Sequence, residues 1–255
     1  MTYTHGHHDS VLRSHSWRTV ENSAAYLMPH LRAGLSLLDV GCGPGTITVD
    51  FSRRLAPGRV IGIDAAADVI AQAEGAEFAT GDVYQLDFDD GTFDIVHAHQ
   101  VLQHLAEPIV ALREMRRVCK PGGLVAVRDG DYGSFAWYPE LPALDAWRDL
   151  YFRVAITNAG EPNAGRHLLE WAHAAGFTDV QASSSTWCFA TPEDRSWWGG
   201  TWAERMTDSA IAQQARAKGF ATDAELREIA DAWRAWAAHP DGWYSVLHGE
   251  VLARA

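Results

Sequence analysis

An apolar, strand-like run that leads into three alternating glycines constrains this chain most strongly. Residues 37–40 read as a buried strand, and Gly41, Gly43 and Gly45 follow before a helical pattern begins. Glycine has no Cβ, so such a loop can turn sharply and lie close to a ligand. In an open α/β sheet, a nucleotide-binding crevice forms at this place, at the carboxyl end of the first strand. Asp39 is unusual beside a phosphate and indicates a ligand that presents a cation.

Composition argues against several classes of partner. The 255 residues fit one α/β domain with elaborations, and the net charge of −12 argues against nucleic acid or an anionic membrane surface. Cys42, Cys119 and Cys188 lie far apart, which indicates a reduced protein rather than a disulfide scaffold. No apolar run has the length of a membrane span, and the amino terminus lacks a signal core. We therefore expect a cytoplasmic protein with a small-molecule substrate. The sequence does not define its oligomeric state, and a homodimer is one of the possibilities.

Strand and helix patterns alternate through the first half of the chain. The predicted strands are residues 36–40, 59–64, 77–80, 93–97 and 123–128, and the predicted helices are 47–55, 68–73, 101–104 and 108–118. A Lys-Pro-Gly-Gly turn at residues 120–123 precedes the fifth strand. Such alternation implies right-handed crossovers and a mostly parallel sheet.

The segments on either side of this core follow other patterns. Residues 10–31 read as helices, which predicts an N-terminal helical lid over 1–34. Beyond the core at 35–130 we expect helices near 144–156 and 166–175, further helices starting at Thr191 and Thr222, and strands at 180–189 and 244–253. No linker separates these parts, so the prediction is one domain over 1–255, with substrate-binding elements and the final strands in 131–255.

Acidic residues stand at the ends of successive predicted strands. Asp64 closes the second strand, about twenty residues beyond the glycines, where a carboxylate can accept hydrogen bonds from both hydroxyls of a ribose. Asp82 follows the third strand and is placed to bind the exocyclic amine of an adenine. Any one of these acids alone is typical of a solvated loop. Their joint placement with Asp39 favours a nucleoside ligand.

The motifs in this core resemble those of a known enzyme family. The matching segments are Leu38-Asp39-Val40-Gly41-Cys42-Gly43-Pro44-Gly45-Thr46, Ile61-Gly62-Ile63-Asp64, Gly81-Asp82, Phe93-Asp94-Ile95-Val96, Val101-Leu102-Gln103-His104-Leu105 and Arg117-Val118-Cys119-Lys120-Pro121-Gly122-Gly123. With them the chain resembles the class I S-adenosylmethionine-dependent methyltransferases, most of all the ubiquinone/menaquinone-biosynthesis type (methyltransferase type 11/25). The resemblance covers about residues 36–128. It implies a Rossmann-like, seven-stranded, mostly parallel sheet with helices on both faces and a helical insertion before the last strand.

The resemblance also implies a cofactor site for S-adenosylmethionine, with S-adenosylhomocysteine as the product. The glycine loop would hold the methionine portion with Asp39 near its ammonium group, Asp64 would bind the ribose, and Asp82 and the Val83 amide would bind the adenine. The implied cofactor residues, to which we add Arg18 as a partner for the cofactor carboxylate, are Arg18, Asp39, Gly41, Cys42, Gly43, Gly45, Thr46, Asp64, Ala65, Asp82, Val83, His97, Ala98, His99 and Gln100. A surface salt bridge is an equal alternative for Arg18.

Two alternative functions use the same fold. An NAD-dependent oxidoreductase would also employ the glycines and Asp64, but its fingerprint requires glycine or alanine where Thr46 stands, and it gives no reason for Asp39. A non-catalytic protein that binds S-adenosylmethionine for a regulatory or interaction role would retain the whole crevice. Methyl transfer is the interpretation that accounts for most of the motifs.

Methyl transfer asks little covalent chemistry of the protein. The reaction is an in-line displacement at a sulfonium, and alignment and desolvation supply most of the acceleration. A general base is needed only where the acceptor must lose a proton. The candidates are His99 after the fourth strand and Asp129 and Asp131 after the fifth. Simple packing is as good an explanation for His99, and solvated loop acids for the other two. Family members commonly carry histidine where Gln103 stands, so a catalytic role there is in doubt.

Tryptophan is the compositional outlier, with eleven residues, most of them in the second half. They indicate either an aromatic pocket or a core or oligomer interface. The residues predicted to wall the acceptor site are Tyr3, Trp17, Tyr132, Trp137, Trp197, Trp198 and Trp202. We expect a large, flat, apolar acceptor, such as a quinone, a polyketide or another aromatic product of secondary metabolism, methylated at O, N, C or S. No metal is expected, because the histidines at positions 5, 7 and 8 have no matching carboxylates.

Overall fold

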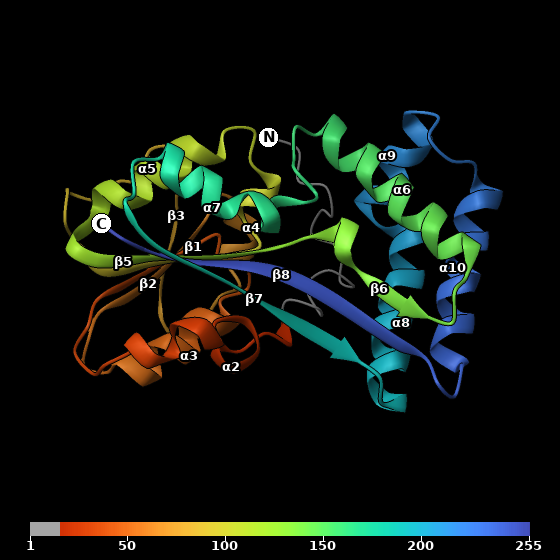
Figure 1. The fold of residues 1–255 in the computed structure, drawn as a ribbon, viewed down its shortest axis with the longest axis horizontal. Coiled ribbons are helices and arrows are strands. Elements are labelled where there is room, and N and C mark those ends of the chain that lie inside the picture. Colours follow the sequence, from red (N-terminus) through yellow and green to blue (C-terminus); the bar gives the residue numbers. More distant parts are fainter. Residues whose placement is uncertain (1–15) are drawn as a thin grey trace.

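The computed structural model describes residues 16–255 and places a mixed sheet at the centre of the fold (Figure 1). Its strands are β1 (Leu37–Val40), β2 (Val60–Asp64), β3 (Glu77–Thr80), β4 (Phe93–His99), β5 (Cys119–Gly130), β6 (Ala136–Tyr138), β7 (Asp179–Phe189) and β8 (Trp243–Arg254). The order is β3-β2-β1-β4-β5-β8-β6, and β7 pairs with the other edge of β8. Strands β1 to β5 are parallel, whereas β8 is antiparallel to β5, β6 and β7. The predicted Rossmann-like, mostly parallel architecture is confirmed, with the short β6 as an eighth strand.

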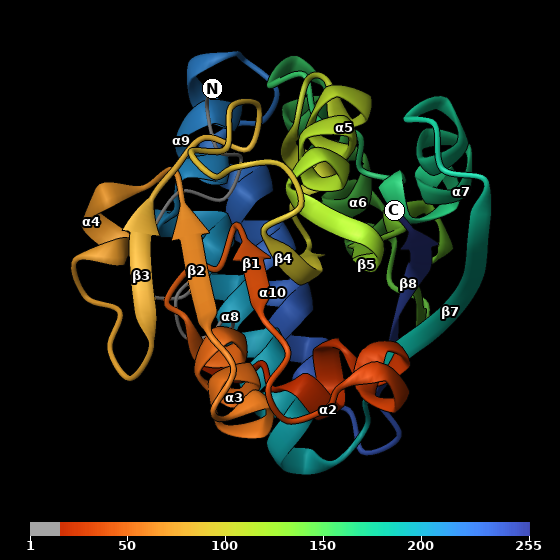
Figure 2. The same ribbon diagram turned by 90° about the vertical axis from the view of Figure 1, so that its left-hand side faces the viewer.

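Helices cover both faces of the parallel part of the sheet (Figure 2). One face carries α2 (Val20–Ser23), the 3-10 helix η1 (Ala25–His30) and α3 (Thr46–Leu55), and the other carries α5 (Pro108–Val118) and α7 (Ala164–Ala174). The short α4 (Ala67–Ile70) lies beside β3, and the 3-10 helices η2 (Leu102–His104) and η3 (Tyr132–Ser134) follow β4 and β5. Of the helix predicted over 10–31, residues 20–30 form two short pieces, and residues 1–15, with Tyr3, lie outside the described residues.

A second helical layer lies beyond the far ends of the long antiparallel strands (Figure 1). This helical unit consists of α6 (Pro142–Thr157), α8 (Pro192–Asp208), α9 (Ala210–Ala217) and α10 (Asp223–Ala238). Its centre is aromatic: the Trp147 ring lies 4.6 Å from Trp202 and 5.1 Å from Trp233, both edge-on. Trp236 and Tyr244 complete this fully buried group. Much of the tryptophan excess therefore forms a core, which is one of the two roles that the composition predicts.

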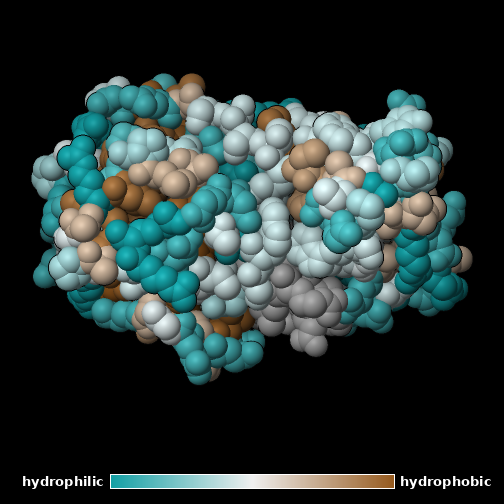
Figure 3. Space-filling view, turned by 90° about the horizontal axis from the view of Figure 1, so that it is seen from below, coloured by the Kyte–Doolittle hydropathy of each residue, from teal (hydrophilic) through white to brown (hydrophobic). Residues whose placement is uncertain are grey.

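The outer surface agrees with this division. On the face seen from below, hydrophilic residues cover much of the helical unit, and the most hydrophobic surface residues lie over the sheet (Figure 3).

Both predicted helix starts are confirmed. Thr191 accepts a hydrogen bond from the Asp194 backbone N–H, and Thr222 forms a capping box with Glu225. Within residues 16–255, no helix combines the length and apolarity that crossing a membrane requires.

Two strands extend further than their sequence patterns predict. β4 continues to His99 rather than ending at residue 97, and β5 runs on to Gly130. Pairing explains the difference, because His99 remains in register with Arg128. Polar residues at these positions hide strand structure from an apolar pattern, yet the ladder continues. His99 and Asp129 therefore belong to rigid strands rather than to the loops that the sequence suggests.

Candidate functional site

One cavity of about 1080 Å³ lies at the carboxyl ends of β1, β2, β3 and β4 and reaches to the helical unit. The strand-end half of its wall consists of residues 39–44, 46–47, 63–69, 80–84, 99–101 and 103–107. The opposite half consists of Trp17, Arg18, Tyr132, Phe135, Trp187, Trp198, Trp202, Arg205 and Val246. Single-ligand pockets occupy roughly 300–1,000 Å³. The cavity is thus slightly larger than the upper end of this range.

The glycine loop is fixed in a shape that only glycine tolerates easily. Gly41 has φ +66°, and a Cβ there would lie 2.4 Å from Val101 Cγ2. Gly45, with φ +84°, is the N-cap of α3; it packs against the Phe78 ring and does not itself line the cavity. The Gly43 N–H donates to Asp64 Oδ2 at 3.0 Å. The loop is therefore held open toward the cavity by its neighbours on β2 and β3.

Asp39 is a buried carboxylate with a fixed orientation in the cavity wall. Its Oδ2 accepts a 2.6 Å hydrogen bond from the Thr48 hydroxyl, and its Oδ1 lies 2.8 Å from His97 Nδ1. His97 packs edge-on against Phe51, with ring centroids 5.0 Å apart, and does not line the cavity. Ala98 also lies away from the wall, in the core on the other face. His97 is thus a support for Asp39, whereas the sequence places it beside the cofactor.

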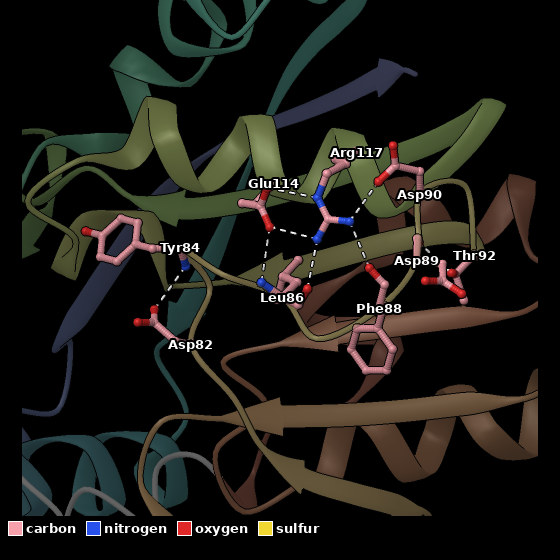
Figure 4. A network of polar contacts seen from close by, with 9 residues as sticks. All are labelled: Asp82, Tyr84, Leu86, Phe88, Asp89, Asp90, Thr92, Glu114 and Arg117. Atoms are coloured by element: carbon pink, nitrogen blue, oxygen red, sulfur yellow. Dashed lines mark hydrogen bonds and ion pairs between the residues drawn. The ribbon is translucent and has the colours of Figure 1, made fainter.

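Asp64 and Asp82 both line the cavity at the ends of β2 and β3. Asp64 accepts from the Gly43 N–H and, through Oδ1 at 2.9 Å, from the Ala66 N–H. A carboxylate offers about four acceptor sites, so two remain for a ribose diol. Asp82 is exposed, and its Oδ1 accepts from the Tyr84 N–H at 2.9 Å (Figure 4).

The loop that carries Asp82 is anchored by Arg117 at the end of α5 (Figure 4). The Arg117 guanidinium donates to the carbonyl oxygens of Leu86 and Phe88, both at 2.8 Å, and to Glu114 Oε2 at 2.9 Å. Glu114 also accepts from the Leu86 N–H, and the hydrogen bond from Arg117 lowers the pKa of the Glu114 carboxyl. The Arg117–Gly123 sequence motif therefore contributes to the site indirectly, by fixing the loop after β3.

A chain of hydrogen bonds holds Arg18 against the opposite wall. Arg18 Nη2 donates to Gln100 Oε1 at 2.5 Å, and Gln100 Nε2 lies 2.9 Å from His248 Nε2. His248 Nδ1 lies 3.0 Å from the Val246 carbonyl, which can only accept, so Nδ1 carries the proton and Nε2 accepts from Gln100. Arg18 also lies 5.7 Å above the Trp187 ring. No sequence pattern indicates His248, because its partner is 148 positions away.

His99 is the predicted catalytic candidate that reaches the cavity. It is buried, lines the wall, and has its ring 5.5 Å from Trp187. Neither ring nitrogen has a hydrogen-bond partner among residues 16–255. Burial, followed by the positive charges of Arg18 and Arg128, lowers the pKa of His99 well below its ordinary value. The imidazole is therefore neutral at pH 7, with a lone pair that can accept a proton or a hydrogen bond.

The other two catalytic candidates do not line the cavity. Asp129 is buried in β5, where its Oδ1 accepts from the Gln103 N–H at 3.1 Å; burial raises its pKa to about 7. Asp131 forms a two-pronged ion pair with Arg166, with both distances 2.6 Å. These carboxyl groups anchor η2 and α7 to the end of β5. The predicted reactive roles of Asp129 and Asp131 therefore find no support in their positions.

The predicted acceptor wall is placed only in part. Trp17, Tyr132, Trp198 and Trp202 line the cavity. Trp137 instead stacks on Tyr244 with ring centroids 5.7 Å apart, and Trp197 packs behind Trp17. The wall residues that the sequence pattern did not predict are Phe135, Trp187, Arg205 and Val246. The spacing of positions 198, 202 and 205 on one helix is the signal that would have identified Arg205.

The cofactor prediction is also placed residue by residue. The predicted cofactor residues that line the cavity are Arg18, Asp39, Gly41, Cys42, Gly43, Thr46, Asp64, Ala65, Asp82, Val83, His99 and Gln100. In the part of the chain that the structure describes, no group of three or more His, Cys, Asp or Glu side chains is arranged to hold a metal ion. The histidines at positions 5, 7 and 8 lie outside that part.

Comparison with known proteins identifies the family. A family profile described as a methyltransferase domain matches residues 38–127, and an uncharacterized methyltransferase of Schizosaccharomyces pombe is 34% identical over 98% of this chain and 95% of its own length. The chain belongs to the class I S-adenosylmethionine-dependent methyltransferases. A demethylmenaquinone methyltransferase of Staphylococcus aureus is 32% identical to this methyltransferase, over only 58% of this chain and 62% of its own length. The crystal structure of the Bacillus subtilis protein YcgJ has the same fold, with a TM-score of 0.57 at 22% identity over 92% of this chain and 98% of its own.

Proposed function

We propose that this methyltransferase transfers a methyl group from S-adenosylmethionine to a small aromatic metabolite bound against its tryptophan wall. The observation that carries the proposal is that one cavity has two chemically different halves. The strand-end half offers backbone groups and carboxylates, and the other half offers aromatic rings. Each half matches one of the two reactants of such a transfer.

The residues present fit the cofactor. The glycine loop exposes backbone beside the buried Asp39, which suits an ammonium group, and Asp64 retains acceptor sites for a ribose diol. Asp82 and Val83 line the end of the cavity where an adenine would follow. When bound, S-adenosylmethionine supplies a methyl group activated by a positively charged sulfur. Arg18, oriented by Gln100, would pair with the carboxylate of the methionine portion.

The protein's own part in the reaction is alignment and exclusion of water. Rings such as Tyr132 and Trp198 form an apolar wall on which a flat acceptor can stack, and their burial keeps solvent from the reacting atoms. His99, at the junction of the two halves, accepts a proton where the acceptor must lose one. Because its pKa is lowered, it is a weak base, which suits an acidic phenol or a thiol better than an alcohol. We also propose that the acceptor is a quinone or a polyketide and that the enzyme acts in secondary metabolism in the cytoplasm.

Calorimetry and a transfer assay test it directly. The purified protein is titrated with S-adenosylmethionine and, separately, with NAD; formation of S-adenosylhomocysteine is then followed with a panel of phenols, quinones and thiols. We expect S-adenosylmethionine to bind and NAD not to bind, and we expect turnover with at least one aromatic acceptor. Binding of NAD alone would overturn the proposal. Cofactor binding without turnover across the panel would favour the non-catalytic alternative.

A further inference from the structure

We propose that Arg205 forms an anion-recognition subsite in the acceptor half of the cavity, so that the methyl acceptor is an aromatic compound with a separate acidic group, such as a carboxylate. The proposal rests on the proposed function, because it takes that half of the cavity as the acceptor site. It adds the charge of the acceptor, which neither the fold nor the family defines.

Charge is distributed unevenly along the cavity wall. The acidic residues that line it are Asp39, Asp64, Asp68, Asp82 and Glu107, all within the strand-end half. In the opposite half, the charged residues among those described are Arg18 and Arg205, both positive, and Arg18 donates a hydrogen bond to Gln100 of the strand-end half. A negative acceptor would be repelled by the first half and attracted by the second, which orients it toward Arg205.

Arg205 is built into the wall rather than attached to its rim. Trp198, Trp202 and Arg205 follow one another at helical spacing on α8, and all three line the cavity. Arg205 is only 4% exposed, and its Cζ lies 4.9 Å from the centre of the Trp202 ring. A guanidinium remains protonated even when buried, and its planar fork matches a carboxylate with two parallel hydrogen bonds. The cation–π contact with Trp202 holds the guanidinium against that ring.

A second donor lies on the same helix face. Trp198 Nε1 is buried and has no hydrogen-bond partner among residues 16–255, and an indole N–H can only donate. The Trp198 ring is held in place by stacking on Phe189, with centroids 4.3 Å apart and planes 11° from parallel. The Arg205 charge also acts on the phenol of Tyr132 in the same half of the cavity, where it opposes the rise in the Tyr132 pKa that burial causes. This end of the cavity thus offers donors to a ligand that brings acceptor atoms.

The acidic group and the methyl-accepting atom are expected to be different atoms. Two hydrogen bonds from a guanidinium withdraw electron density from an oxygen and make it a poorer nucleophile. The accepting atom is better placed beside His99 and the cofactor, with the acidic group held away from the transfer by Arg205. Arg205 is therefore a specificity-determining residue, which selects acceptors by charge.

A matched pair of ligands tests the charge selection. The probes are 3-hydroxy-2-naphthoic acid and its neutral carboxamide, titrated into the full-length protein with and without S-adenosylhomocysteine and followed by tryptophan fluorescence. We expect the acid to bind about 10- to 100-fold more tightly than the amide. Arg205→Met should abolish this preference while amide binding is retained, and Arg205→Lys should keep part of it. Arg234→Met, on the exposed face of α10, is the control that should leave the preference unchanged.

The outcomes separate this proposal from the one that it extends. Equal binding of acid and amide to the unmodified protein would overturn the subsite, as would a preference that survives Arg205→Met. Either result leaves the methyltransferase proposal intact as long as S-adenosylhomocysteine binds. If S-adenosylhomocysteine does not bind to the unmodified protein, the proposed function is overturned instead. Circular dichroism shows whether Arg205→Met folds; should it not fold, Arg205→Lys and the acid–amide comparison in the unmodified protein decide the matter.

Discussion

The two halves of the cavity are built from different parts of the polypeptide. In the strand-end half, which we propose as the cofactor half, backbone conformation and strand ends create the site. Gly41 has a positive φ, and Asp64 accepts hydrogen bonds from two backbone N–H groups. In the acceptor half, side chains of α8 and its surroundings form the wall, with Trp198 and Arg205 on one helix face. A backbone-built site tolerates few substitutions, whereas a wall of side chains can be remodelled. If the proposed function is correct, the choice of acceptor should therefore change with substitutions in the second half, while cofactor binding is retained.

The largest effect is expected where the acceptor half merges with its core. Trp147 is fully buried and surrounded by aromatic rings, whereas Trp243 is 41% exposed. Trp147→Ala should lower the free energy of unfolding by about 3–5 kcal/mol because it leaves a large cavity. Trp243→Ala should cost less than about 1 kcal/mol. Urea denaturation followed by circular dichroism measures both; equal losses would mean that Trp147 is not part of a packed core.

In the cofactor half, adding a single methyl group to the glycine loop should weaken cofactor binding. Gly41→Ala combines positive φ with a Cβ 2.4 Å from Val101, so the substitution should place roughly 1–3 kcal/mol of strain on the loop. If binding the cofactor requires the present loop shape, affinity should fall by about 5- to 150-fold. Gly34→Ala is the matched control, since Gly34 has φ +88° with nothing within 4 Å of its Cβ. It should cost stability but leave the dissociation constant for S-adenosylmethionine unchanged. An unaltered constant for Gly41→Ala, measured by calorimetry, would contradict the backbone-built site.

Within the same half, the two carboxylates should differ. Asp64→Ala removes the expected acceptor for the ribose and the bond that shapes the glycine loop, so cofactor affinity should fall by about 1–3 kcal/mol. Asp82 is exposed, so Asp82→Ala should have a smaller effect. Calorimetric titration with S-adenosylhomocysteine gives both values. The ribose assignment is wrong if the dissociation constant of Asp64→Ala equals that of the unmodified protein.

The sequence-predicted residues of the backbone-built half line one cavity for a physical reason. Glycine spacing and acids at strand ends are local signals, and the parallel sheet brings them to one edge. The prediction of wall residues in the other half was incomplete, because buried aromatic residues are found equally well in a core and in a pocket. Nothing local distinguishes Trp147, in the core, from Trp198, in the wall. The Gln100–His248 contact depends on the antiparallel return of β8, which brings together two residues that are 148 positions apart in the sequence.

The same reasoning misplaced residues where a strand outlasted its apolar pattern. His97 and Asp129 carry polar side chains, and the sequence therefore assigned them to a strand end or a loop beside the ligand. The ladder between β4 and β5 extends past His97, the pairing of β5 with β8 extends past Asp129, and both side chains reach structural partners. Polarity at a strand end thus indicates the vicinity of a site but not which side chains enter it.

The smallest effect concerns pH and the seam between the halves. His99 on β4 and His248 on β8 are buried there, and burial lowers the pKa of each well below its ordinary value of 6.5. Unfolding exposes them, so below pH 6.5 the unfolded chain binds protons that the folded protein does not. The free energy of unfolding should therefore fall with acidification, at up to about 1.4 kcal/mol per pH unit for each histidine. Asp129 has the opposite sign: its pKa of about 7 makes the folded state hold a proton that the unfolded chain releases.

Substitution separates these contributions. His99→Asn removes one titrating group whose ring nitrogens have no hydrogen-bond partner within residues 16–255, so the stability profile between pH 6.5 and 5 should become flatter by as much as one proton's slope. Asp129→Asn should make the profile steeper, because it removes a contribution that opposes those of the two histidines. His173→Asn, at an exposed position on α7, should leave it unchanged. Urea denaturation at half-unit pH steps measures the slopes; an identical slope for His99→Asn and the unmodified protein would show that His99 does not stay neutral in the folded state.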